Sequence, residues 1–145
     1  VKKGFILDGY PRNLSQAKTL DDILGARKLD IGMIFYLDSS DNVIIQRLAG
    51  RLVCKACAAN FHIKNMPPKK NGICDHCGAR LYQRKDDQEP TVKKRLEVYK
   101  KEAASLIEFY KVKQKLHRLS ADAEPKLVLS EIIEIALKCD DSLKV

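Results

Sequence analysis

Two pairs of cysteines constrain this chain more than any other feature. Cys54 and Cys57 form one C-x-x-C pair, Cys74 and Cys77 form a second, and sixteen residues separate the two pairs. Each C-x-x-C turn presents two sulfurs to one point, so two such turns can complete a tetrahedral sulfur site for zinc. Four sulfur ligands leave no position for water, so the predicted metal is structural and not catalytic. Residues 54–82 are therefore predicted to form a small module held by one zinc ion.

Other uses of the cysteines are less well supported. Disulfides are typical of secreted proteins, whereas this sequence shows no signal-peptide pattern and no apolar run long enough to span a membrane, so we expect a cytoplasmic protein. Redox catalysis uses one C-x-x-C pair, and here there are two. His62 and His76 lie nearby, but a fifth ligand would be surplus, and we interpret both as ordinary loop residues. Cys139 is predicted to be a small apolar core residue of the last helix.

The composition is that of one soluble domain with a core, and it is basic. The chain is 45% hydrophobic and 32% charged, with 27 Lys and Arg against 19 Asp and Glu, a formal charge of +8. Four thiolates on one divalent metal would carry about −2 and lower the total to roughly +6. Such an excess indicates an anionic partner, but it does not choose between nucleic acid, nucleotide and acidic membrane.

The first forty residues alternate between apolar runs and a helical period. Residues 5–7 predict a buried parallel strand, and the Gly and Pro that follow predict a turn. Asn13 and Gln16 resemble a capping box at the start of a helix, which Gly25 is predicted to end. A second strand is predicted over residues 31–37. The stripe expected on the first helix consists of Ala17, Leu20 and Leu24.

The alternation continues on both sides of the cysteine segment. A second helix is predicted from Asp41 and extends to Leu52. A long helix is predicted from about Thr91, followed by a short strand over residues 116–121 and a last helix over residues 127–137. Alternating strands and helices predict an α/β fold with a parallel sheet.

Five arginines and one aspartate are candidates for binding phosphate. Arg47 and Arg51 are predicted four residues apart on the second helix, where like charges repel unless an anion lies between them. Each arginine alone is commonly a solvated surface charge, but five beside strand ends and an insert indicate a polyphosphate clamp. Asp8 follows the first predicted strand, where a carboxylate can hold hydrated magnesium; a turn-forming Asp before Gly explains it equally well. The other three arginines are Arg12, Arg84 and Arg95.

Taken together, these segments resemble the adenylate kinase family, from Val1 to about residue 137. The four-cysteine segment lies where the zinc-containing bacterial members carry their lid. The resemblance implies part of a P-loop-type parallel-sheet core over residues 1–50, a zinc-binding lid over 51–88, and the C-terminal helices and last strand of the core over 89–145. The matching segments are residues 4–12, 16–17, 47–51, 82–87, 91 and 95–96.

Two departures qualify the resemblance. Tyr10 stands where the family usually has Phe, which keeps the aromatic ring. No G-x-x-x-x-G-K-[ST] phosphate loop occurs in these 145 residues, nor does the AMP-side helical domain that should follow it. We therefore expect the chain to be a fragment, the C-terminal two-thirds of such a kinase, with little activity alone.

The resemblance implies a reversible, magnesium-dependent transfer of a phosphoryl group from ATP to AMP, giving two ADP. Arg12 would hold the AMP phosphate and Gln16 the adenine, with Gly9, Tyr10 and Pro11 beside them. Asp8 would order the water shell of magnesium. The ATP contacts implied are Arg47, Arg51, Asn60, Phe61 and the backbone near Ala123. Arg84 and Arg95 would clamp the transferring phosphates and contact AMP, and Asp86 and Asp87 would tie the arginines of the lid when it closes.

Two rival functions stay open at the level of sequence. A related kinase could act on another nucleoside monophosphate, because Gln16 is the only residue of this sequence that indicates adenine as the base. A non-enzymatic zinc ribbon could bind nucleic acid, but the interleaved basic and aromatic residues that this needs amount to Lys64, Lys69, Lys70 and Phe61. We expect ATP, AMP and ADP as partners, no nucleic acid or membrane, and a monomeric parent enzyme.

Overall fold

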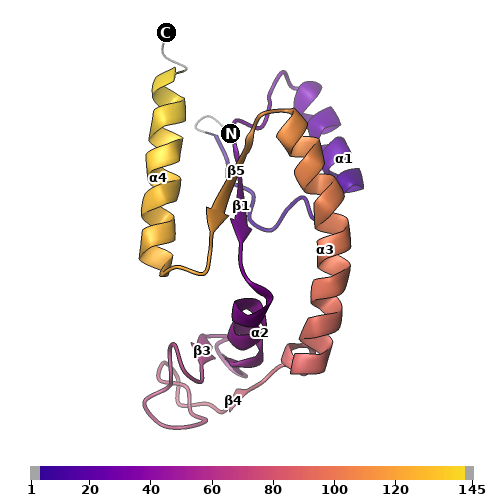
Figure 1. Ribbon diagram of the computed structural model, residues 1–145. Coiled ribbons are helices and arrows are strands. Elements are labelled where there is room, and N and C mark those ends of the chain that lie inside the picture. The colour runs from indigo at the N-terminus through magenta and orange to yellow at the C-terminus, as the bar shows by residue number, and fades with distance from the viewer. Residues whose placement is uncertain (1–3, 143–145) are drawn as a thin grey trace. The chain divides into compact units, whose positions relative to one another are not determined.

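The computed structural model describes residues 4–142 (Figure 1). The chain divides into two compact units: residues 1–38 with 99–145, and residues 39–98. Among the described helices, none is both long enough and apolar enough to cross a lipid bilayer.

The first unit contains a parallel pair of strands. β1 (Ile34–Asp38) pairs with β5 (Leu116–Ser120), with Ile34 opposite Leu116 and Asp38 opposite Ser120. Both strands were predicted, and the parallel pairing confirms the α/β class. β1 begins later than predicted because its ladder starts where the Ile34 N–H donates to the carbonyl of Lys115, at 2.8 Å.

The predicted strand at residues 5–7 is wrong. Phe5, Ile6 and Leu7 adopt no regular structure, and Ile6 is 95% exposed. A strand needs a neighbour to bond its N–H and C=O groups. Within residues 4–142 no strand lies beside this segment, because the first unit's sheet consists of β1 and β5 alone.

The first helix forms as predicted. α1 (Leu14–Gly25) is capped by Asn13, whose Oδ1 accepts the N–H of Gln16 at 3.0 Å. Gln16 Oε1 accepts the N–H of Arg12 at 2.8 Å, one residue before the cap, so the capping box is present in a shifted form. The predicted stripe of Ala17, Leu20 and Leu24 is buried.

Two further helices complete this part of the chain. α3 (Glu89–Val112) begins in the second unit and ends in the first, and it buries a stripe that runs from Val92 through Leu96 and Ala103 to Tyr110. α4 (Pro125–Ser142) follows β5 and buries Val128. The predicted core residue Cys139 is half-buried.

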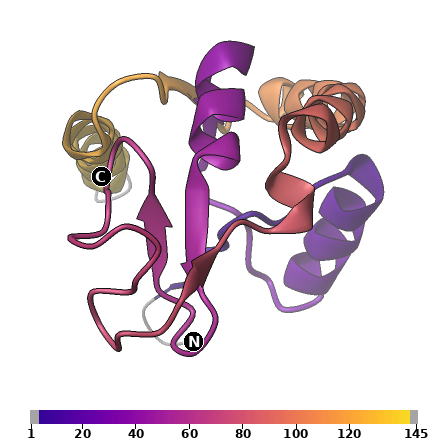
Figure 2. The same ribbon diagram turned by 90° about the horizontal axis from the view of Figure 1, so that it is seen from below.

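The second unit is built on a small antiparallel sheet, seen in magenta to pink from below in Figure 2. The central strand β2 (Arg51–Cys54) pairs with β3 (Asn60–His62) on one side and β4 (Leu81–Tyr82) on the other. A single 3-10 turn, η1 (Lys85–Asp87), leads to α3. One apolar cluster of this unit consists of Cys54, Phe61 and Cys74, with Leu52, Ala59, Ala79 and Leu81 packed around them.

The predicted extent of the second helix is wrong. α2 (Asp41–Ala49) ends at Ala49, with Gly50 as its C-cap, and Arg51 already belongs to β2. The N–H of Gly50 donates to the Gln46 carbonyl and closes the last helical turn, while the Gly50 carbonyl accepts the N–H of Ile63 from the end of β3. Arg47 and Arg51 therefore do not share a helix face; they flank a helix-to-strand junction.

Candidate functional site

The four cysteines of the second unit converge. Their Sγ atoms all lie within 4.8 Å of one another. The Cys54–Cys77, Cys57–Cys77 and Cys57–Cys74 sulfur separations are 3.4, 3.5 and 3.6 Å. A tetrahedral zinc–sulfur site with bonds of about 2.3 Å has sulfur–sulfur edges of about 3.8 Å, whereas a disulfide bond is about 2.05 Å long. The geometry therefore fits one tetrahedral metal and no disulfide, and the cysteines are free thiols.

The two C-x-x-C turns have the same local structure. The N–H of Cys54 donates to the carbonyl of Ala59, and the N–H of Ala58 donates back to the carbonyl of Cys54. In the second turn the same two bonds link Cys74 with Ala79 and Gly78. This repeat of one hydrogen-bonded turn explains how two separate segments present their sulfurs alike.

Hydrogen bonds to sulfur prepare the site for a cation. The N–H groups of Cys57 and Ala56 donate to Cys54 Sγ, at 3.5 and 3.4 Å, and lower the pKa of Cys54 to about 6. The N–H of Ala59 lowers the pKa of Cys57, but the neighbouring sulfurs of Cys77 and Cys54 outweigh it and raise the pKa to about 12. The Cys54 thiolate thus forms readily, whereas Cys57 needs a metal to replace its proton.

The residue after the second cysteine of each turn offers a matched pair of substitutions. Gly78 has φ 73° and Ala58 has φ 57°, a left-handed conformation that costs a residue with a Cβ roughly 1 kcal/mol. We expect Gly78→Ala to weaken metal binding by the four cysteines about fivefold, since a Cβ there meets no atom within 4 Å and only backbone strain acts. Ala58→Gly relieves such strain and should not weaken binding. Competition with a chromogenic chelator measures both; equal weakening by the two variants would contradict this account.

Arg51 and Asp87 form the best-defined ion pair of the second unit. Arg51 Nε lies 2.8 Å from Asp87 Oδ2 and its Nη2 lies 2.5 Å from Oδ1, a bidentate arrangement. Asp87 is fully buried, and its hydrogen bonds raise the pKa of Arg51. A guanidinium has five N–H donors, so Asp87 leaves three of them for another ligand. Asp87 thus fixes the position of the Arg51 guanidinium and leaves three of its N–H groups able to donate to another ligand.

The second predicted carboxylate is placed differently. Asp86 Oδ2 lies 3.3 Å from Nη1 of Arg95, and both side chains are about half exposed. Arg84 opens η1, and its carbonyl accepts the N–H of Asp87 at 3.1 Å. Ion pairs with Asp87 and Asp86 thus place Arg51 and Arg95 beside η1, and the backbone of Arg84 begins that turn.

The remaining candidates of the second unit lie on α2 and β3. Arg47 is in the last turn of α2. Asn60 is exposed on β3, whereas the side chain of Phe61 is buried against Cys54 and Cys74. A nucleotide contact by Phe61 would use its backbone, and the nucleotide roles of all these residues stay predictions.

The AMP-side candidates form one compact turn in the first unit. Arg12 Nε donates to the Gly9 carbonyl at 2.8 Å, and the Arg12 N–H donates to Gln16 Oε1, also at 2.8 Å. Asp8 and Tyr10 are exposed, and Pro11 follows Tyr10 through a cis peptide. Because residues 5–7 form no strand, the expected place of Asp8 at a strand end is not realised. Ala123 is exposed in the turn between β5 and α4.

The sequence interpretation missed His62. It is not a loop residue but lies buried in β3, with its ring against Gly50 and its Nε2 3.1 Å from the carbonyl of Gln46. The sequence did contain a signal for the end of this helix. Gly50 can end a helix, as Gly25 does, and would have indicated a helix-to-strand junction at this position.

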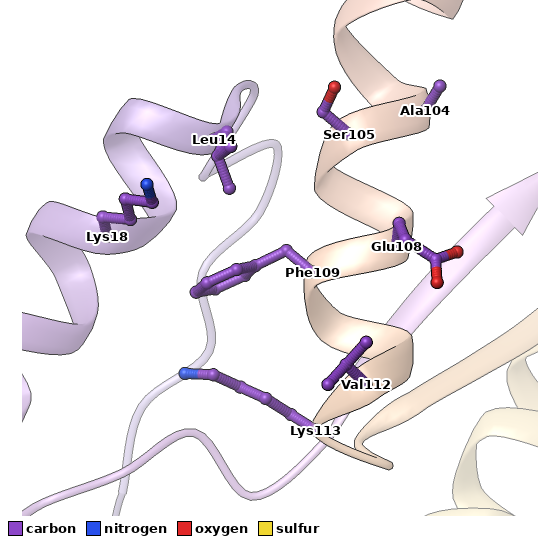
Figure 3. A pocket seen from close by; sticks show the side chains of 8 residues that line it. All are labelled: Leu14, Lys18, Ala104, Ser105, Glu108, Phe109, Val112 and Lys113. Atoms are coloured by element: carbon purple, nitrogen blue, oxygen red, sulfur yellow. The ribbon is translucent and has the colours of Figure 1, made fainter.

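A groove of about 690 Å³ lies elsewhere, between α1 and α3 in the first unit (Figure 3). Apolar side chains such as Phe109 and Val112 line it together with Lys18 and Lys113. None of the predicted site residues lines this groove, so the groove does not support the nucleotide-binding roles predicted for them.

Comparison with known proteins agrees with this arrangement. The sequence profile of the family described as "Adenylate kinase" matches residues 1–115. An "Adenylate kinase" of Caldicellulosiruptor saccharolyticus is 50% identical over 112 residues, which cover 77% of this chain and 52% of the relative. An "Adenylate kinase" of Methanosarcina mazei is 43% identical over 137 residues, covering 94% of this chain and 63% of the relative.

The matches cover only part of the length of each of these relatives. A third, the "Adenylate kinase" of Thermosipho melanesiensis, is 40% identical over 134 residues and is covered to 63%. The chain thus spans about half to two-thirds of the length of the curated relatives it matches. With four-fifths of its residues inside the family profile and a four-cysteine cluster able to hold a metal, this chain belongs to the adenylate kinase family.

Proposed function

We propose that this chain carries the AMP-binding turn and the metal-binding lid of an enzyme that converts ATP and AMP reversibly into two ADP. The observation that carries the proposal is the match of residues 1–115 to the adenylate kinase family, a range that includes the Gly9–Gln16 turn and all four clustered cysteines; relatives named adenylate kinase are 40–50% identical. The proposed domain division is core over residues 1–50, lid over 51–88 and core again over 89–145. We further propose a monomeric enzyme of the cytoplasm.

The reaction needs positioning and charge neutralisation rather than a nucleophilic side chain. An oxygen of the AMP phosphate attacks the γ-phosphorus of ATP, and the bond from that phosphorus to the β–γ bridging oxygen breaks. In this proposal Arg12 binds the AMP phosphate and Gln16 the adenine. Four arginines, Arg47, Arg51, Arg84 and Arg95, stabilise the charge on the transferring group. Magnesium would be bound together with the nucleotide, and Asp8 would order its water shell.

The lid has a mechanical role in this proposal. Asn60, the backbone of Phe61 and the turn at Ala123 would border the adenine and ribose of ATP. Closing over the nucleotides excludes water, so that ATP is not hydrolysed. We propose zinc as the metal, held by Cys54, Cys57, Cys74 and Cys77. Four sulfur ligands make it a structural ion that organises the lid.

Arg12 provides the test of the AMP turn. Calorimetric titration of the 145-residue chain with AMP should show binding that Arg12→Ala weakens about 10- to 100-fold, because a charged donor to phosphate is lost. Arg27→Ala is the matched control: its guanidinium donates to the Ile23 carbonyl at the end of α1 and belongs to no proposed site. Equal AMP affinity in the Arg12 variant would refute the assignment.

Substrate choice and the rival functions are decided by the same titration. AMP binding tighter than GMP, CMP or UMP binding supports adenine, whereas a preference for another base would indicate a different nucleoside monophosphate kinase. Binding of RNA or DNA that falls steeply with salt, without response to adenine nucleotides, would indicate a zinc-ribbon module instead. Formation of ATP and AMP from magnesium-ADP by the chain itself is expected to be slight, because it contains no P-loop motif.

A further inference from the structure

Side chains of the lid complete the C-terminal end of α2. The Gln46 carbonyl accepts the Gly50 N–H at 3.1 Å and also lies 3.1 Å from Nε2 of His62. The Ala49 carbonyl accepts an N–H of the Gln83 amide at 2.6 Å. The last carbonyls of a helix have no partners within the helix. Here Gln83, after β4, supplies a partner for the Ala49 carbonyl, and His62 of β3 adds a second hydrogen bond to the Gln46 carbonyl, which ties the lid to the helix that precedes it.

The orientation of the His62 ring is set by its own turn. Its Nδ1 accepts the N–H groups of Lys64 and Asn65, at 3.0 and 2.9 Å, so the proton resides on Nε2. Nε2–H is therefore the donor to Gln46. The backbone N–H and carbonyl of His62 both bond to Met66, which closes the turn. The ring cannot rotate away without losing its bonds on both nitrogens.

The ring also lies directly on the backbone of the junction. A Cβ at Gly50 would lie 2.2 Å from Nε2 of His62 and 2.5 Å from its Cε1, so it would clash with the ring. Only glycine admits this approach. The carbonyl of the same Gly50 accepts the N–H of Ile63, so the residue after His62 holds the junction as well.

We propose that His62 is a positioning residue, which clamps the α2–β2 junction and thereby holds Arg47 and Arg51 in the relation that binds the triphosphate of ATP. Arg47 precedes the junction in the last turn of α2, and Arg51 follows it as the first residue of β2, directly opposite His62 in the sheet register. Two guanidiniums on either side of a loose junction would have to be ordered when the nucleotide binds, at a cost in affinity. This inference rests on the proposed function.

Two substitutions distinguish the bond from His62 to the Gln46 carbonyl from the bonds that His62 accepts within its own turn. The Asn oxygen in His62→Asn can accept the Lys64 and Asn65 N–H groups as Nδ1 does, but the side chain is too short to reach Gln46. The longer amide in His62→Gln can donate to the Gln46 carbonyl. We expect His62→Asn to weaken ATP binding about five- to tenfold, the effect of one lost hydrogen bond, and His62→Gln to change it less than twofold. His76→Asn, the same substitution at an exposed histidine, is the control.

Zinc content and hydrogen exchange distinguish positioning from folding. In His62→Asn the amides of Gly50 and Ile63 should exchange about tenfold faster, while zinc stays at one per chain. ATP affinity equal to that of the unaltered chain would overturn the proposal, as would loss of zinc together with ATP affinity, which would show a general folding role. If the unaltered chain binds no ATP, the ligand named here fails for this chain, whereas AMP binding that depends on Arg12 tests the proposed function separately. The exchange rates at Gly50 and Ile63 would then still show whether His62 clamps the junction.

Discussion

Removal of the metal is expected to unfold the lid while leaving the first unit folded. The apolar cluster beside the metal-binding sulfurs comprises Cys54, Phe61, Cys74 and a few partly buried neighbours, which is too little to stabilise a sheet of three short strands. Binding of structural zinc contributes about 10–16 kcal/mol in small domains, so most of the stability of the lid should depend on it. Chelation, or Cys74→Ser, should therefore abolish protection of the lid amides.

Hydrogen exchange measured residue by residue tests this expectation. The N–H groups of Cys54 and Cys74, which donate to Ala59 and Ala79, should lose protection, whereas the Ile34 N–H, bonded to Lys115 in the first unit, should keep it. Cys139→Ser is the control, because this cysteine lies outside the cluster. Lid amides that stay protected in the metal-free chain would show that the sheet is stable by itself. Metal affinity should also fall as the pH falls, since the thiols must release protons to bind.

Replacing Arg51 is expected to destabilise the second unit by about 3 kcal/mol. Arg51→Met keeps the bulk of the side chain but leaves the Asp87 carboxylate without its counter-charge in a fully buried place. Because the Arg51 side chain is 28% exposed, we take the lower end of the range for broken buried pairs. Replacing both partners, as Arg51→Met with Asp87→Leu, should recover part of the loss. Urea denaturation followed through lid amides measures the difference.

The neighbouring ion pair provides the matched control. Arg95 and Asp86 are separated by 3.3 Å and are 52% and 55% exposed, so Arg95→Met should cost about 0.5 kcal/mol or less. Equal losses in the two variants would show that burial does not distinguish the pairs. Arg51 also has a proposed role toward ATP, so its substitution should lower ATP affinity both by removing donors and by loosening the lid. The double variant with Asp87→Leu separates these two effects.

Elements that depend on short-range interactions were predictable from the sequence. The helix from Leu14 to Gly25 follows from an Asn cap, a stripe of apolar residues and a terminal Gly, all within a dozen residues. The metal site follows from the same kind of local rule, since each C-x-x-C turn positions its own two sulfurs. The pairing of β1 with β5 was also accessible, because two apolar runs separated by helices favour a parallel sheet.

Other features depend on contacts between residues that are far apart in the sequence. Residues 5–7 have the composition of a strand, but no strand lies beside them among the described residues, and backbone groups pair only where a partner exists. The burial of Asp87 and its pairing with Arg51 join positions 36 residues apart, which no local pattern predicts. The end of α2 at Ala49 and the role of His62 depend on one another, because the ring occupies the space that a side chain at Gly50 would need. Turns, caps and the four clustered cysteines could therefore be predicted, because their interactions are local. The ion pair between Arg51 and Asp87, by contrast, depends on packing between distant parts of the chain.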